Sequence, residues 1–184
     1  MYFDESLLLD LRLNYLDKFV DKFIIIECNY NHKGELKKPT FNIEKYKKFE
    51  NKIEYVLLKD QPKNIERINV KDTENETSDK YILNAIKREN FQRNHIKNCL
   101  SEAASNDWII ISDLDEIPNL SNVNFKNIKN KFIFFKQDMM YYKFNLKLEN
   151  CSWVGTKACQ MKNLESPQWL RNIKDRSYSW WRLD

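Results

Sequence analysis

A short apolar run in the middle of the chain limits the possible folds more than any other feature. Residues 108–111 are four uninterrupted aromatic or β-branched residues, and such a run predicts a strand buried on both faces. Three carboxylates follow directly, at Asp113, Asp115 and Glu116. Pro118 then prevents the strand from continuing. The sequence therefore predicts a central strand of a mostly parallel sheet, with acidic residues at the C-terminal edge where open α/β sheets bind ligands.

The two aspartates of this segment suggest a metal site. If the backbone stays extended, side chains alternate between faces, so Asp113 and Asp115 lie on the same face. Two neighbouring carboxylates repel each other unless a cation offsets their charge, and oxygen ligands suit Mg²⁺ or Mn²⁺. The competing interpretation is a solvated acidic turn after a core strand, because so short a motif recurs by chance.

Composition excludes several functional classes. The chain has 184 residues, of which 42% are hydrophobic and 14% aromatic, enough for one domain with a sizeable core. The net charge of +4 is modest and its signs are interspersed, so we expect no nucleic-acid partner. No apolar run is long enough to span a bilayer, and no signal-peptide pattern is present, so we expect a cytoplasmic protein. The two glycines, Gly34 and Gly155, exclude a Walker A loop and a GxGxxG turn.

The first part of the chain alternates helix and strand patterns. Asp4 is a plausible N-cap for the first helix, and the first strand ends in Glu27, another carboxylate at a strand's C-terminal edge. The predicted elements are a helix at 4–18, a strand at 20–26, a short helix around 43–49 and a strand at 53–58. The polar residues 59–80 predict a surface excursion.

A longer helix is predicted over residues 81–104. Its apolar stripe is interrupted by Glu89, Gln92 and Arg93, which fall on the same face by helical spacing. Polar groups on a core-facing stripe are unfavourable unless they are paired. We therefore expect these three side chains to face the interior or to line a cavity.

The last part of the chain is rich in aromatic residues. Residues 132–135 and 139–144 predict a hairpin or added strands packed beside the first sheet. Aromatics exposed there would suit stacking on sugar rings, although core packing is their default role. Ser166 and Pro167 open a short helix. The chain ends on Trp180 and Trp181 without a capping signal, so we expect the sequence to be C-terminally incomplete.

Several of these segments together resemble glycosyltransferase family 17, which includes the β-1,4-mannosyl-glycoprotein β-1,4-N-acetylglucosaminyltransferases. The matching segments, in order, are residues 4–13, residues 23–27, Gly34 with its nearby lysines, residues 88–94 and residues 110–118. The resemblance implies a GT-A-like fold with an antiparallel, aromatic-rich part after the Asp-x-Asp strand. It also implies a UDP-sugar donor, UDP-GlcNAc in characterised members, a glycan acceptor, and inversion at the anomeric carbon.

The resemblance also assigns roles to residues. Asp113 and Asp115 would form the metal and diphosphate site with Mn²⁺ or Mg²⁺. The donor-binding set would further include Glu27, Arg88, Gln92 and Arg93, in which the arginines are candidates for phosphate contacts. An inverting transfer needs a base for the acceptor hydroxyl, and Glu116 and Asp138 are both candidates. Within a single domain, residues 1–118 would bind the donor and residues 119–184 the acceptor.

Two rival functions compete with this interpretation. A phosphatase of the haloacid-dehalogenase type also has Asp-x-Asp after an apolar strand, but usually near the start of its domain. A non-catalytic or truncated carbohydrate- or nucleotide-binding protein on the same fold is the other rival. It gains weight because relatives usually continue to a Gly-Trp-His-Phe segment, and in many GT-A enzymes a late histidine helps to bind the metal. Here the histidines are His32 and His95, both early.

Overall fold

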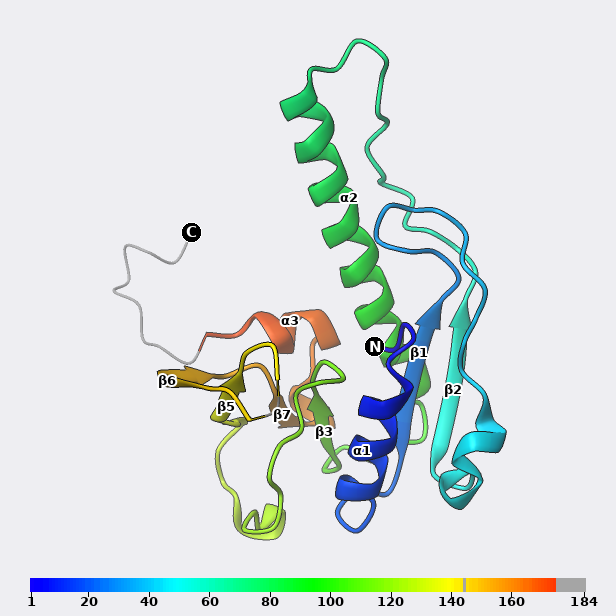
Figure 1. Cartoon of the computed structure of the whole chain (residues 1–184). Coiled ribbons are helices and arrows are strands. Elements are labelled where there is room, and N and C mark those ends of the chain that lie inside the picture. The colour runs from blue at the N-terminus through cyan, green and yellow to red at the C-terminus, as the bar shows by residue number, and fades with distance from the viewer. Residues whose placement is uncertain (144, 175–184) are drawn as a thin grey trace. The chain divides into compact units, whose positions relative to one another are not determined.

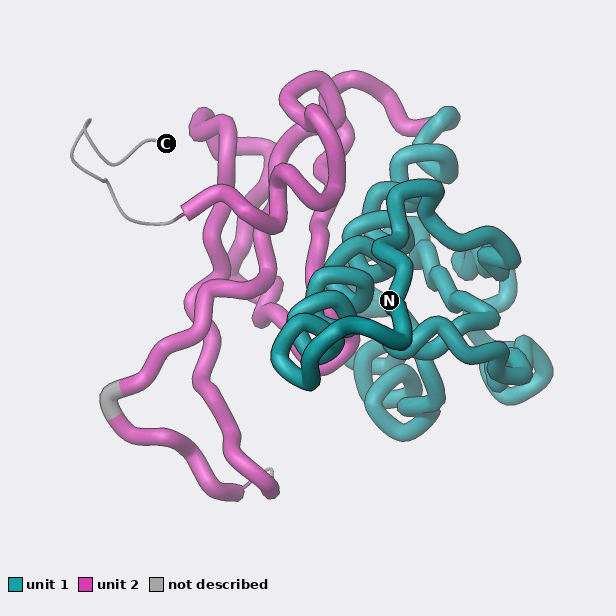
Figure 2. The backbone as a smooth tube through the Cα atoms, turned by 90° about the horizontal axis from the view of Figure 1, so that it is seen from above, with its two compact units in different colours: residues 1–102 teal, residues 103–184 magenta. Residues whose placement is uncertain are grey.

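The computed structural model describes residues 1–143 and 145–174 and divides the chain into two compact units. The first comprises residues 1–102 and the second residues 103–184 (Figure 2). Each unit contains its own helices and strands (Figure 1). Trp180 and Trp181 lie outside the described residues. The assignment of donor and acceptor roles to residues 1–118 and 119–184 stays a prediction.

The first unit is built on a pair of parallel strands. Strand β1 (Phe23–Cys28) pairs with β2 (Ile53–Leu58), from Phe23 opposite Ile53 to Cys28 opposite Leu58. Both strands were predicted from their apolar runs. Ile26, Leu58 and Cys99 form a buried cluster at this pair, and parts of the following helices pack against it.

Four helical segments accompany these strands. They are α1 (Ser6–Leu16), the 3₁₀ segment η1 (Ile43–Phe49), α2 (Glu74–His95) and the 3₁₀ segment η2 (Ile96–Cys99). The predicted cap of α1 at Asp4 is wrong: the N-cap is Glu5, whose side chain makes no capping bond to the helix. Instead, a Glu5 carboxylate oxygen accepts the backbone N–H groups of Phe3 and Asp4.

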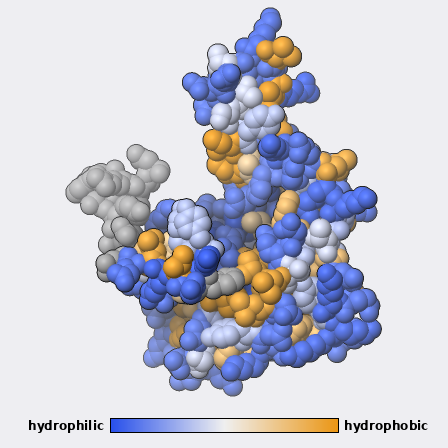
Figure 3. All heavy atoms as spheres, viewed as in Figure 1, coloured by the Kyte–Doolittle hydropathy of each residue, from blue (hydrophilic) through white to orange (hydrophobic). Residues whose placement is uncertain are grey.

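Helix α2 begins earlier than the apolar pattern predicts because a local cap starts it within the polar segment. The Thr73 hydroxyl accepts the Glu76 N–H at 3.3 Å, and the Glu76 carboxylate accepts the Thr73 N–H at 2.8 Å, which is a capping box. The first half of α2 extends past the strands (Figure 1). Its apolar residues lie on the surface, with Ile82 58% exposed (Figure 3). The stripe is therefore not buried along its whole length.

The second half of α2 lies against β1, and Gln92 and Arg93 face inward as predicted, whereas the Glu89 side chain is 38% exposed. Gln92 donates from Nε2 to the carbonyl of Ile26 at 3.0 Å. Arg93 is only 3% exposed and donates to Glu89 Oε1 at 2.7 Å, one helical turn away. Paired in this way, the polar groups can interrupt the apolar stripe without leaving an unsatisfied buried charge.

The second unit is built on antiparallel strands. Strand β7 (Lys157–Gln160) lies between β3 (Trp108–Ile111) and β4 (Phe132–Phe134) and is antiparallel to both. A separate hairpin joins β5 (Gln137–Met140) to β6 (Lys147–Trp153). The remaining segments are η3 (Phe125–Asn127), η4 (Met161–Asn163) and α3 (Pro167–Asn172).

The predicted position of the acidic strand is wrong. In the described residues β3 is an edge strand with an antiparallel neighbour, and only Ile111 of its four residues is fully buried. An apolar run indicates how much a strand is buried, but the direction of its neighbour depends on distant residues. The mixed α/β class is confirmed, whereas parallel pairing in the described strands is limited to β1 and β2. The GT-A-like arrangement stays a prediction.

Candidate active site

The acidic segment after β3 forms a turn. The N–H of Glu116 donates to the carbonyl of Asp113 at 3.2 Å, and the chain reverses at Leu114 and Asp115. Strand alternation therefore ends before these residues, and it does not place Asp113 and Asp115 on one face as predicted. Their surroundings differ: Asp113 is half-buried, Asp115 is exposed and Glu116 is buried.

Glu116 is the best-anchored carboxylate of this turn. Its Oε1 accepts the indole N–H of Trp153 at 2.5 Å and a guanidinium N–H of Arg171 at 2.7 Å. Its Oε2 accepts the backbone N–H of Asp113 at 3.0 Å. The side chain is 7% exposed. With both oxygens engaged inside the unit, Glu116 shapes the turn and is poorly placed to accept a proton from a substrate.

Arg171 links the two buried or half-buried carboxylates. One of its guanidinium nitrogens lies 2.8 Å from Asp113 Oδ2 and 2.7 Å from Glu116 Oε1. It comes from α3, which Pro167 starts and where Ser166 accepts the N–H of Trp169 at 3.1 Å. The cation offsets a repulsion that the carboxylates would otherwise exert on each other.

The sequence pattern gave no indication that Arg171 or Trp153 belongs to this site. The short helix at Ser166 and Pro167 was predicted, but nothing local indicates that its last turn meets a carboxylate 58 residues earlier in the chain. The one available signal was the excess of negative charge after β3, which requires a cation from elsewhere.

Gly155 allows the backbone to pass close to this cluster. A Cβ atom built on Gly155 would lie 1.7 Å from Glu116 Oε1 and 2.2 Å from the indole nitrogen of Trp153. Any other residue would therefore displace the carboxylate or the indole. The adjacent Thr156 hydroxyl donates to the Glu116 carbonyl at 3.3 Å.

The metal role of Asp113 and Asp115 stays a prediction. Within the described part of the chain, no group of three or more His, Cys, Asp or Glu side chains is arranged to hold an ion. Mg²⁺, however, is usually held by one or two carboxylates together with substrate phosphates rather than by an all-protein cage. Exposed Asp115 and half-buried Asp113 can supply that smaller ligand set.

Asp138 lies apart from the contacts described above. It is on β5, its side chain is 59% exposed, and its Oδ1 is 2.8 Å from Lys147 Nζ on the paired strand. An exposed pair of this kind contributes little to stability. Its carboxylate is accessible to solvent, in contrast to that of Glu116.

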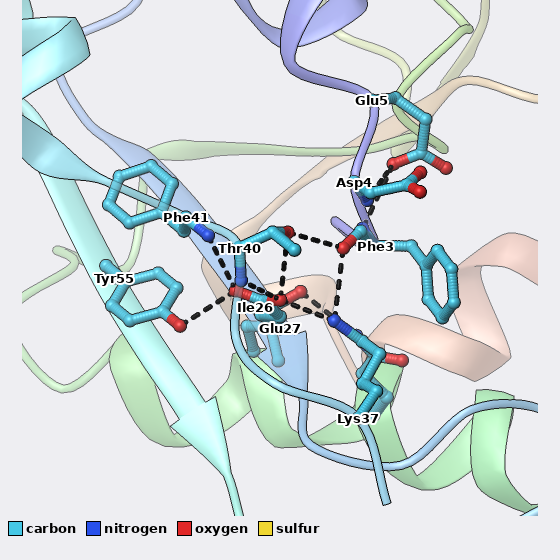
Figure 4. Close-up of polar contacts among 10 residues, drawn as sticks. Phe3, Asp4, Glu5, Ile26, Glu27, Lys37, Thr40, Phe41 and Tyr55 are labelled. Atoms are coloured by element: carbon cyan, nitrogen blue, oxygen red, sulfur yellow. Dashed lines mark hydrogen bonds and ion pairs between the residues drawn. The ribbon is translucent and has the colours of Figure 1, made fainter. Parts of the chain in front are cut away.

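The donor-binding candidates of the first unit are held by the protein itself, most completely at Glu27 (Figure 4). Glu27 is 0% exposed. Its oxygens accept hydrogen bonds from Lys37 Nζ at 2.5 Å, the N–H groups of Thr40 and Phe41 at 2.8 and 3.1 Å, and the Tyr55 hydroxyl at 2.9 Å. Burial alone would raise the pKa of Glu27, but these hydrogen bonds outweigh it and lower the pKa. Through these hydrogen bonds, Glu27 stabilises the position of the loop that follows β1.

Arg88, on α2, also holds the loop that follows β1 in place. It donates from Nε to Gln61 Oε1 at 2.8 Å and from Nη1 to the His32 carbonyl at 2.9 Å. Gly34 has φ +89°, and a Cβ there would lie 2.2 Å from the guanidinium. Glu27, Arg88, Gln92 and Arg93 therefore all have protein partners, and their contact with a donor stays a prediction.

Comparison with known proteins gives a match to a family model. The model of glycosyltransferase family 17 matches residues 1–168, which include both acidic strand ends and the turn after β3. No curated protein and no solved structure matches the chain. None of the helices in the described residues is long and apolar enough to cross a membrane.

Proposed function

This chain belongs to glycosyltransferase family 17, and we propose that it transfers N-acetylglucosamine from UDP-GlcNAc to a hydroxyl of a glycan, with inversion. Membership of the family means a sugar donor and an acceptor, and it argues against the phosphatase interpretation. The observation that carries the finer proposal is the acidic turn after β3, where Arg171 fixes Asp113 while Asp115 remains exposed.

In this proposal Asp115 and Asp113 hold Mn²⁺ or Mg²⁺ together with the donor diphosphate. When bound, the ion would offset the negative charge that develops on the leaving diphosphate. The Asp113 side chain is held in one position because Arg171 and the turn restrain it. Asp115 is suited to direct contact with solvent-borne ligands because it lies on the surface.

We expect Asp115→Asn to weaken UDP binding in the presence of Mn²⁺ by about tenfold, since one charged ligand is lost. The free energy of unfolding should change by less than about 0.5 kcal/mol, because the side chain is exposed. Calorimetric titration with UDP, with and without Mn²⁺, measures this effect. Glu149→Gln, another exposed carboxylate of the second unit, is the matched control. Equal UDP affinity with and without Mn²⁺ would rule out the metal role.

For the base, the structure favours Asp138 over Glu116 because the Asp138 carboxylate is exposed and the Glu116 carboxylate is engaged. We expect Asp138→Asn to lower kcat by about 100-fold, within the range of a lost general base, while UDP affinity stays unchanged. Transfer from UDP-GlcNAc to a glycan panel provides kcat. Lys147→Gln controls for loss of the ion pair and should leave kcat within about threefold of the unmodified protein. A normal kcat in Asp138→Asn would exclude Asp138 as the base.

A further inference from the structure

Trp153 combines a fixed polar edge with an open apolar surface. It ends β6, and its indole N–H donates to the buried carboxylate of Glu116 at 2.5 Å. The residue is nevertheless 45% exposed. A tryptophan N–H usually finds a hydrogen-bond partner when the side chain is buried. Here the ring is anchored at one edge while much of its surface faces solvent.

Neighbouring groups restrict the orientation of this indole. The Arg171 guanidinium lies 5.7 Å from the ring centroid, within reach of a cation–π contact. Gly155 passes so close that a Cβ would lie 2.2 Å from the indole nitrogen. A ring held in place before a ligand arrives loses little conformational entropy when it binds one.

An unpaired acceptor lies opposite Trp153 on the hairpin. Gln137 of β5 is directly opposite Trp153 in the strand register, and opposite residues of an antiparallel pair project from the same face. The side-chain carbonyl oxygen of Gln137 is buried and has no hydrogen-bond partner among the residues that the structure describes. Such unsatisfied groups are rare in folded proteins, and a water molecule or a bound ligand can serve as their partner.

This combination suits a sugar ring. The C–H face of a pyranose is apolar and matches the exposed indole, while its hydroxyls supply several hydrogen-bond donors. The polar groups nearby are acceptors: the Gln137 carbonyl oxygen and the carboxylate of Asp113, whose side chain is 31% exposed. A uracil base would also stack on the ring but offers only one N–H donor, so the acceptors favour the sugar.

We propose that Trp153, with Gln137 beside it, forms a subsite for a pyranose ring of the glycan acceptor other than the reacting one, because Asp138, the residue after Gln137, projects from the opposite face of the hairpin. The term acceptor rests on the proposed transferase function, whereas the binding of a neutral glycan does not. Arg171 positions the subsite, because its guanidinium lies over the Trp153 ring and is paired with Asp113 and Glu116.

The experiment observes the tryptophan itself. The chain has five tryptophans, so ¹H–¹⁵N spectra contain up to five indole signals, and the one missing in Trp153→Phe identifies Trp153. The probes are methyl β-glucopyranoside, methyl α-mannopyranoside and N,N′-diacetylchitobiose, each titrated without UDP or metal. We expect a saturable shift of the Trp153 signal with at least one probe, and saturation transfer to the C–H protons of its ring.

Two substitutions separate stacking from hydrogen bonding. Trp153→Phe keeps an aromatic face but loses the bond to Glu116, so binding of the glycoside should weaken by about twofold. Trp153→Ala should weaken it by about tenfold. Tyr142→Ala is the matched control, because Tyr142 is 88% exposed at the other end of the same hairpin and should bind as the unmodified chain does. If Trp153→Ala fails to fold, the unmodified protein and Trp153→Phe still decide the question.

Three results would overturn the proposal: no shift of the Trp153 signal with any glycoside, an equal loss of binding in Tyr142→Ala, or a shift produced by metal-free UDP instead of glycosides. The outcome is separate from the test of the transferase function. Glycoside binding at Trp153 without metal-dependent UDP binding would retain the sugar subsite and reject the donor site. The reverse pattern would retain the donor site and reject the subsite.

Discussion

Arg171→Ala is expected to lower the free energy of unfolding of the second unit by about 3–5 kcal/mol, the usual effect of breaking a buried ion pair. The guanidinium is 14% exposed and a single nitrogen contacts both Asp113 and Glu116. Without it, the Glu116 carboxylate, 7% exposed, keeps its charge in the interior with a second carboxylate nearby. The large effect comes from the charge that is left uncompensated in the interior, and not from the intrinsic strength of the ion pair.

Urea unfolding followed by tryptophan fluorescence measures this change. All five tryptophans lie in residues 103–184, so the signal reports on the second unit. Arg171→Lys should lose less stability, because one cationic nitrogen already makes both contacts. Adding Glu116→Gln to Arg171→Ala should restore part of the loss, since it removes the buried charge. A loss below about 1 kcal/mol, or no recovery in the double variant, would contradict this explanation.

Glu27→Ala is expected to destabilise the first unit by a similar amount, about 3–5 kcal/mol. The substitution leaves Lys37, only 14% exposed, without its carboxylate. It also removes the acceptor for the N–H groups of Thr40 and Phe41 and for the hydroxyl of Tyr55. Each donor left unsatisfied in the interior adds to the loss.

Far-UV circular dichroism during urea unfolding follows this effect, because the first unit contains no tryptophan. Glu44→Gln is the control. Glu44 pairs with Lys47 in an exposed position, with side chains 71% and 66% exposed, and such a pair contributes about 0–1 kcal/mol. Equal stability losses in Glu27→Ala and Glu44→Gln would show that burial of Glu27 does not matter.

The lowered pKa of Glu27 gives the same prediction a pH dependence. Its pKa is lower in the folded protein than in the unfolded chain, where a glutamate has a pKa of about 4.3. The stabilisation is therefore complete above the unfolded pKa and is lost as the pH falls through the folded pKa. Compared with the unmodified chain, Glu27→Gln should be most destabilised at neutral pH, and the difference should shrink below about pH 4. A stability difference between Glu27→Gln and the unmodified chain that grows as the pH falls would contradict this prediction.

Local sequence patterns by themselves determined the elements and the family. The apolar runs predicted β1, β2 and β3, and Ser166 with Pro167 predicted the start of α3. A helix cap is decided within a few positions and an apolar run marks where a strand forms, but the burial of β3 did not follow from its run. The order of the acidic and apolar segments was enough to indicate glycosyltransferase family 17, which the family match confirms.

Tertiary structure alone decided which side chains meet. Strand β3 has an antiparallel neighbour in which the partner of Trp108, Gln160, lies 52 residues later in the chain (160 − 108), and Arg171 joins carboxylates that lie 58 and 55 residues before it. Glu27 looked like a ligand at a strand end, but the loop after β1 folds over it and supplies its hydrogen-bond donors. A charged side chain can be satisfied by solvent, a ligand or a distant part of the protein, and only the folded chain brings that distant part within a few ångströms.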